Sequence, residues 1–99
     1  IVNTQKILPP AVATGQAGYP EGILDELRRR DIEVIAVDAF ELARSVGEGR
    51  TANVVMVGAL SVFLPVEGEV FAEIIRARVP ERFREVNLEA FAAGRKACQ

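Results

Sequence analysis

The sequence predicts an α/β fold in which a β-α-β unit is followed by a helix-rich carboxy-terminal half. β-branched residues gather in two short runs, residues 1–7 and 32–37, and a helical pattern lies between them. Beyond residue 37 the apolar residues recur at spacings of three and four, which is typical of helices. The 99 residues are 49% apolar and 26% charged, an ordinary globular composition that indicates a single domain.

The first 37 residues are interpreted as one right-handed β-α-β unit. Residues 1–7 favour a strand that ends at Pro9 and Pro10, and residues 32–37 favour a strand buried on most of both faces. A helix is expected over residues 20–30, because Pro20 suits the first helical position. A parallel strand pair needs a crossover of about a dozen residues, which this helix supplies. Because a strand starts at the first residue, we expect earlier elements of the domain upstream.

Four more helices are expected after the second strand. Asp38 suits the cap of a helix that stops at Gly47. Residues 51–64 are apolar nearly all round, so this helix should be buried on several sides before Pro65 interrupts it. Residues 67–79 form an amphipathic pattern, and Pro80 opens the last helix. The residues expected to face inward on these two helices are Val70, Phe71, Ile74 and Ile75, and then Phe83, Val86, Asn87, Ala90, Phe91 and Gly94.

Composition argues against several classes of function. The net charge of −2 gives no positive field for a nucleic acid, and the longest uncharged run, residues 51–66, is too short for a membrane span and contains Pro65. Histidine is absent and Cys98 is the single cysteine, so we expect no metal site, no iron–sulfur cluster and no internal disulfide on this chain. A reducing cytoplasm is the expected location.

Two asparagines lie in apolar, helix-periodic runs, where an unbonded side-chain amide is costly. Asn53 either bonds the backbone of the turn at residues 47–50 or belongs to an anion site. In the second interpretation Arg50, Thr51 and the free N–H groups of a helix N-terminus hold an anion or a phosphate. Asn87 makes either an interhelical hydrogen bond or a ligand contact.

Gly58 and Gly94 lie on helix faces that should be buried, and we expect another backbone to approach each of them closely. No serine, cysteine or lysine has an evident base partner, and the carboxylates are spread along solvent faces. The residues therefore predict no catalytic group on this chain.

Four motifs, in order, resemble the gamma-type domain of 2-oxoacid:ferredoxin oxidoreductases. They are N-T-Q-x-I-x-P from Asn3, G-x-x-x-Y-P from Gly15, A-N-x-x-x-x-G-A-L from Ala52 and N-x-x-A-F-x-x-G from Asn87. Within that family, the beta subunits of indolepyruvate ferredoxin oxidoreductases are the most similar group. The resemblance spans nearly the whole chain, and Asn53, Gly58, Asn87 and Gly94 are carried over as family-motif positions only.

The resemblance implies that residues 1–99 are the carboxy-terminal portion of one doubly wound, Rossmann-like, three-layer domain. The family's earlier G-x-G-G-Q-G turn has no counterpart here. The implied activity is oxidative decarboxylation of an aryl 2-oxoacid, such as indolepyruvate, to the acyl-coenzyme A thioester with ferredoxin as acceptor. The implied partner is a large subunit that carries thiamine diphosphate, magnesium and iron–sulfur clusters, while this chain is mainly structural. Residues 9–19 are then the expected contact loop for coenzyme A or the 2-oxoacid.

Two other hypotheses remain open. The chain could be a free-standing oligomeric binding module that self-associates through the apolar helix of residues 51–64. It could also be a small nucleotide-binding enzyme that uses the helix start at residues 50–53.

Overall fold

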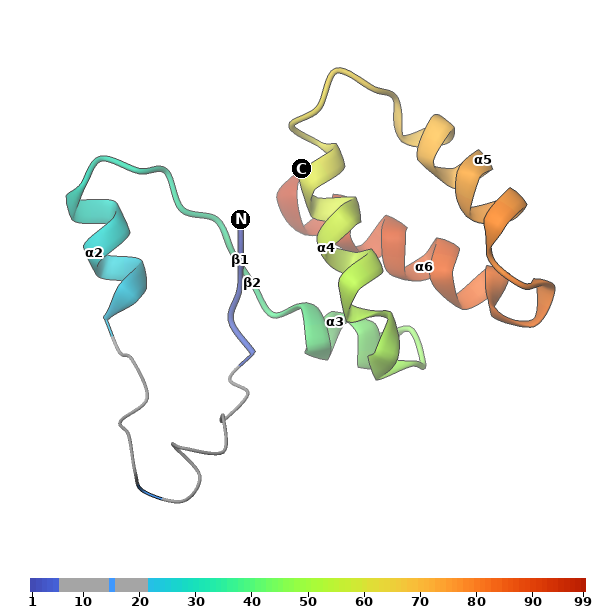
Figure 1. The fold of residues 1–99 in the computed structure, drawn as a ribbon, viewed down its shortest axis with the longest axis horizontal. Coiled ribbons are helices and arrows are strands. Elements are labelled where there is room, and N and C mark those ends of the chain that lie inside the picture. The colour runs from blue at the N-terminus through green and yellow to red at the C-terminus, as the bar shows by residue number, and fades with distance from the viewer. Residues whose placement is uncertain (6–14, 16–21) are drawn as a thin grey trace.

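The structure is a computed structural model that describes residues 1–5, 15 and 22–99. In Figure 1 the helices α3 to α6 form one group, and the strands and α2 lie to one side of it. The expected contact loop at residues 9–19 lies outside the described residues, apart from Gly15. None of the described helices is both long enough and apolar enough to cross a membrane.

The predicted parallel strand pair is confirmed, but it is short. β1 (Val2–Asn3) pairs with β2 (Ala36–Val37), and Val2 lies opposite Ala36. The Val2 N–H donates to the Ile35 carbonyl at 2.9 Å, and the Thr4 N–H donates to the Val37 carbonyl at 2.8 Å. The longer strands predicted over residues 1–7 and 32–37 are wrong for the described part, because backbone groups remain in a ladder only where a neighbouring strand pairs with them.

The connecting helix α2 (Ile23–Arg29) lies within the predicted range of 20–30. It starts after Gly22, whose φ of 72° is left-handed, and the chain turns away at Asp31 with a φ of 59°. No residue of α2 is buried, and Ile23 is 52% exposed. The helix therefore makes the β-α-β connection without contributing to the core of the described residues.

The remaining helices agree closely with the sequence pattern. Asp38 caps α3 (Ala39–Ser45): its carboxylate accepts from the Glu41 N–H at 3.0 Å, and the helix stops before Gly47 with a φ of 105°. A short 3₁₀ turn, η1 (Gly49–Thr51), leads into α4 (Ala52–Ser61). The last two helices are α5 (Gly68–Arg78) and α6 (Glu81–Cys98).

The core lies where α3, α4 and α6 meet. Its buried residues are mostly small, which lets the helices approach closely. Phe71 of α5 stacks on Phe91 of α6 with ring centroids 5.6 Å apart, and this pair joins α5 to the group. The buried apolar residues are Val37, Ala39, Ala43, Val55, Ala59, Ala90 and Phe91.

Several predicted burials are wrong. Val70 and Ile74 on α5 and Phe83 on α6 are 41–54% exposed. On α4, Val57 and Leu60 are 44% and 48% exposed, so this helix is not buried on all the sides that its composition predicted. Periodicity identifies an apolar face, but it does not specify which other element covers that face.

Candidate functional site

Helices α4 and α6 cross in close backbone contact at two glycines. A Cβ atom built on Gly58 would lie 2.1 Å from the carbonyl oxygen of Phe91. A Cβ atom built on Gly94 would lie 1.9 Å from the carbonyl oxygen of Val55. Each glycine therefore makes room for the backbone of the other helix, as the sequence predicted. The two motif segments form one structural unit here.

A polar contact holds the same crossing at one end. Ser61 is buried, its hydroxyl donates to the Gly58 carbonyl at 2.6 Å, and it accepts from the Arg95 guanidinium at 2.9 Å. The guanidinium also packs against Gly68, the first residue of α5, where a Cβ would lie 2.9 Å from Cζ of Arg95. Arg95 thus ties the end of α4 and the start of α5 to α6.

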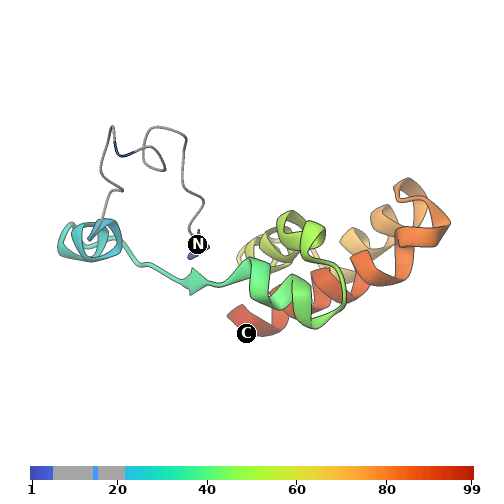
Figure 2. The same ribbon diagram turned by 90° about the horizontal axis from the view of Figure 1, so that it is seen from below.

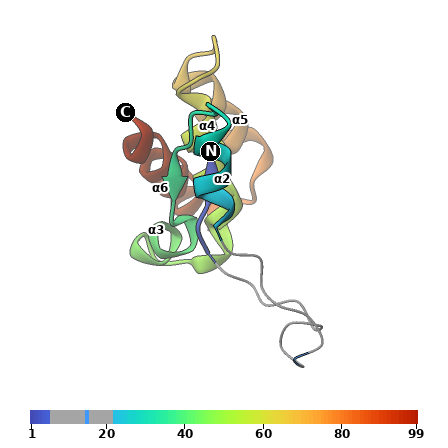
Figure 3. The same cartoon turned by 90° about the vertical axis from the view of Figure 1, so that its left-hand side faces the viewer.

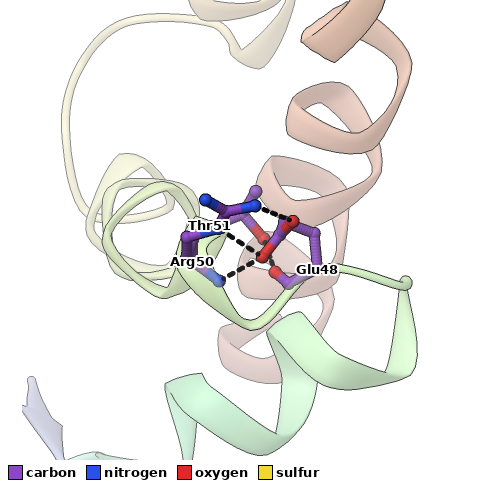
Figure 4. A network of polar contacts seen from close by, with 3 residues as sticks. All are labelled: Glu48, Arg50 and Thr51. Carbon is purple, nitrogen blue, oxygen red and sulfur yellow. Dashed lines mark hydrogen bonds and ion pairs between the residues drawn. The ribbon is translucent and has the colours of Figure 1, made fainter.

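The candidate anion site at Arg50 and Thr51 contains a carboxylate of this chain (Figure 4). The Arg50 Nε and Nη2 atoms lie 3.1 Å from the two oxygens of Glu48, and the Arg50 N–H donates to the same carboxylate at 3.0 Å. The Thr51 hydroxyl donates to the Glu48 carbonyl at 2.7 Å. Glu48 takes two of the five N–H donors of the Arg50 guanidinium, so an incoming anion would compete with Glu48 for these two donors. Anion binding at this turn stays a prediction.

The same contacts explain the two shifted pKa values in the turn. Hydrogen bonds from the Arg50 side chain and backbone favour the ionised carboxylate and hold the pKa of Glu48 below its usual 4.5. The hydrogen bond to Glu48 in turn raises the pKa of Arg50. This pair joins the two ends of the turn that leads into α4.

The hydrogen bonds predicted for the two asparagines are both wrong. Asn53 is exposed near the start of α4, and its side chain makes no hydrogen bond within the described residues. The Asn87 amide donates to the Phe83 carbonyl at 2.8 Å, one turn earlier in its own helix, instead of reaching another helix. Neither side chain needs a ligand to satisfy a buried amide. Their roles as family-motif positions stay predictions.

The predicted site residues therefore do not converge on one pocket. Gly58 and Gly94 meet in the core, Arg50 and Thr51 lie in the turn before α4, and Asn53 faces solvent. Among the described residues, no three or more Cys, Asp or Glu side chains group so that they could hold a metal ion. An iron–sulfur cluster requires several thiolates, and this chain has Cys98 alone, so its residues do not fit such a cluster.

Sequence reasoning missed two polar links that fix the scaffold. The Asn3 carboxamide oxygen accepts from the Ala39 N–H at 3.1 Å and from the Gln5 N–H at 3.1 Å, so β1 is bonded to the first turn of α3. The second link is the contact between Ser61 and Arg95. The signal for Asn3 was its place in the N-T-Q motif, and the signal for Ser61 was a polar residue at the end of an apolar helix.

The family model described as pyruvate ferredoxin/flavodoxin oxidoreductase matches residues 1–97. This chain belongs to that family. The match covers nearly the whole chain and includes both helices of the glycine crossing.

Individual relatives are similar over the same span. A protein from Archaeoglobus fulgidus named indolepyruvate oxidoreductase subunit IorB is 40% identical over 98 residues, which cover 95% of this chain and 49% of the relative. The protein of the same name from Thermococcus kodakarensis is 38% identical over 104 residues, with 98% of this chain and 50% of the relative covered. The chain thus spans about half the length of the curated relatives that it matches. No solved structure gives a significant match.

Proposed function

We propose that this chain is part of a subunit of an indolepyruvate ferredoxin oxidoreductase, in which its role is mainly structural. The similarity to relatives named indolepyruvate oxidoreductase subunit IorB carries the proposal, because the shared span is nearly all of this chain. The complex would convert an aryl 2-oxoacid and coenzyme A to the acyl thioester and carbon dioxide. The electrons released would pass to ferredoxin.

The contacts of the described residues favour a structural role for this chain over a catalytic one. The family-motif glycines are used in helix packing, and Arg50 is bonded to Glu48. Redox chemistry of this kind needs cofactors, and thiamine diphosphate, magnesium and iron–sulfur clusters are proposed to belong to a large partner subunit. The donor set supports this division, because one cysteine and no histidine cannot ligate a cluster.

The fold proposal is that residues 1–99 form the carboxy-terminal portion of one doubly wound, three-layer domain, located in the cytoplasm. The parallel order of β1 and β2, joined through α2, is the arrangement from which doubly wound sheets are built. A parallel sheet is normally covered by helices on both faces. The two-stranded sheet would be one part of a larger sheet of this type.

The test is a reconstitution assay. The protein is produced with and without the large subunit, and indolepyruvate-dependent reduction of ferredoxin is measured with coenzyme A present. We expect turnover only when both subunits are present, with indolepyruvate preferred over pyruvate and 2-oxoglutarate. Turnover by this protein alone would contradict the proposal, and a preference for pyruvate would contradict the substrate assignment.

A matched pair of variants tests the structural role in the same assay. Gly94→Ala should lower the yield of assembled complex, because its new Cβ meets the backbone of α4. Ala92→Gly, at an exposed position two residues earlier in α6, should leave assembly nearly unchanged. Equal yields for the two variants would show that the glycine crossing does not support assembly.

A further inference from the structure

The side of α4 opposite the glycine crossing is uncharged and exposed, and two of its three outermost side chains are apolar. We call Asn53, Val57 and Leu60 the outer face of α4, since they lie on the side of the helix away from Gly58. Val57 is 44% exposed and Leu60 is 48% exposed. Phe63 and Leu64, which follow the helix, are 51% and 41% exposed. Two more exposed apolar side chains therefore follow the outer face along the chain.

The outer face carries no charge, and neither does the segment around it. From residue 51 to residue 66 there is no Asp, Glu, Lys or Arg. A helix that is apolar all round is normally buried inside a domain, whereas an exchangeable interface has a polar rim. The composition of α4 therefore indicates the interior of a larger domain rather than a reversible contact.

The free edge of the sheet lies on the same side of the molecule. Within the described residues β1 pairs with β2 alone, so the other edge of β1 is open to a further strand. In Figures 2 and 3 the N-terminal strand lies on the side of α4, and α6 lies on the opposite side. One polypeptide could therefore pair with β1 and cover α4 together.

We infer that the outer face of α4 and the free edge of β1 are covered by the polypeptide equivalent to the half of the relatives that this chain does not span. This chain aligns with 49–50% of the length of those relatives. The rest of each relative is therefore a segment about as long as this chain, which is long enough to cover both surfaces. The inference holds whether that segment is joined to these residues or supplied separately. It rests on the fold and on the covered share, and not on the proposed redox activity.

The experiment co-expresses this chain and the unmatched half of the Archaeoglobus fulgidus relative, as a separate tagged polypeptide, in the same cells so that the two can fold on each other. We expect the two to co-purify as a one-to-one complex. Amides of α4 and β1 should exchange hydrogen more slowly in that complex than in this chain alone. Failure to co-purify, or exchange that slows elsewhere but not in α4 and β1, would overturn the inference.

Two variants with similarly exposed apolar side chains locate the contact. Leu60→Glu places a charge on the outer face of α4 and should weaken the complex about a hundredfold or more, since a buried unpaired charge is costly. Ile74→Glu changes a residue on α5 that is 54% exposed, and it should change the affinity by less than about threefold. Circular dichroism of each variant alone checks that its helices are formed. Val57→Thr, a milder change on the same face, should weaken the complex if Leu60→Glu does not fold.

The variants also distinguish the proposed polypeptide from other molecules that could cover the outer face of α4. If this chain instead forms a dimer that Leu60→Glu breaks, and the tagged half does not bind, the occupant is a second copy and the inference is wrong. If Ile74→Glu weakens the complex and Leu60→Glu does not, the contact lies on α5 and the inference is also wrong. Because the readout is binding, a failed reconstitution of redox activity would leave these results unaffected.

Discussion

Adding one methyl group at Gly94 should destabilise the protein, although alanine is the better helix former. In Gly94→Ala the new Cβ would lie 1.9 Å from the Val55 carbonyl oxygen and 2.9 Å from the Ala59 amide nitrogen. Ordinary van der Waals contact starts near 3.4 Å, so the shortfall at the oxygen is about 1.5 Å. Both neighbours are backbone atoms within a helix and cannot rotate away. α4 and α6 must therefore separate.

The magnitude follows from two opposing effects. Overpacking a well-packed contact costs about 1–3 kcal/mol, and a clash of this size belongs at the upper end of that range. Replacing glycine by alanine within a helix stabilises it by about 1 kcal/mol. We expect Gly94→Ala to lower the free energy of unfolding by about 2 kcal/mol. Separation of the helices would also loosen the buried contacts of Val55 and Ala59.

Urea unfolding followed by far-UV circular dichroism measures this difference. The control is Ala92→Gly on the exposed side of α6, which isolates the effect of helix propensity and should cost about 1 kcal/mol. If Gly94→Ala is as stable as the unmodified protein or more stable, the close backbone approach is not present and the reasoning is refuted.

Substitutions at three polar contacts give further predictions. Ser61→Ala removes the hydroxyl that accepts from Arg95, so the free energy of unfolding measured in urea should fall by about 1–2 kcal/mol. The double variant with Arg95→Ala should lose less stability than the sum of the two single variants, because both remove the same hydrogen bond. Asn3→Ala removes the acceptor at the start of α3 and should cost about 0.5–2 kcal/mol, whereas Asn3→Asp keeps the acceptor and should retain most of the stability. The pKa of Glu48 is lowered in the folded state, so its contribution to the free energy of unfolding is present above pH 4.5 and is lost as the pH falls through the lowered pKa. The difference in stability between the unmodified protein and Glu48→Gln should therefore shrink in acid. A difference that grows in acid would contradict the ion pair between Glu48 and Arg50.

Local sequence signals were sufficient for most of the helices. Asp38 and Gly47 mark the two ends of α3 in the sequence and do so in the structure, because capping depends on neighbouring backbone groups alone. The close approach at Gly58 and Gly94 was also predictable, since a glycine on a buried helix face is costly without such a contact.

Long-range relations were less predictable. Asn53 was expected to be buried because it lies in an apolar run, but the side of α4 that carries it is uncovered in the described residues. Asn87 was expected to bond another helix, yet a carbonyl four residues earlier in its own helix is always within reach of such an amide. The bond from Asn3 to Ala39 joins residues 36 positions apart, and spacing alone does not reveal it.

The same limit applies to the candidate site. The sequence correctly placed Arg50 and Thr51 at a helix entrance, but their hydrogen bonds to Glu48 follow from the geometry of η1. Whether an anion binds there is a question for a calorimetric titration of the protein and of Arg50→Ala.

We propose that the motif residues of α4 and α6 serve the scaffold of an oxidoreductase complex and not its chemistry. The most direct measurement is kcat per mole of assembled complex for Asn87→Ala, with indolepyruvate, coenzyme A and ferredoxin as substrates. We predict a kcat within about threefold of the unmodified complex, because the Asn87 amide bonds its own helix. Loss of a hydrogen-bond donor to the reacting atoms lowers the rate about a hundredfold or more, and a loss of that size in an intact complex would contradict a purely structural role for Asn87.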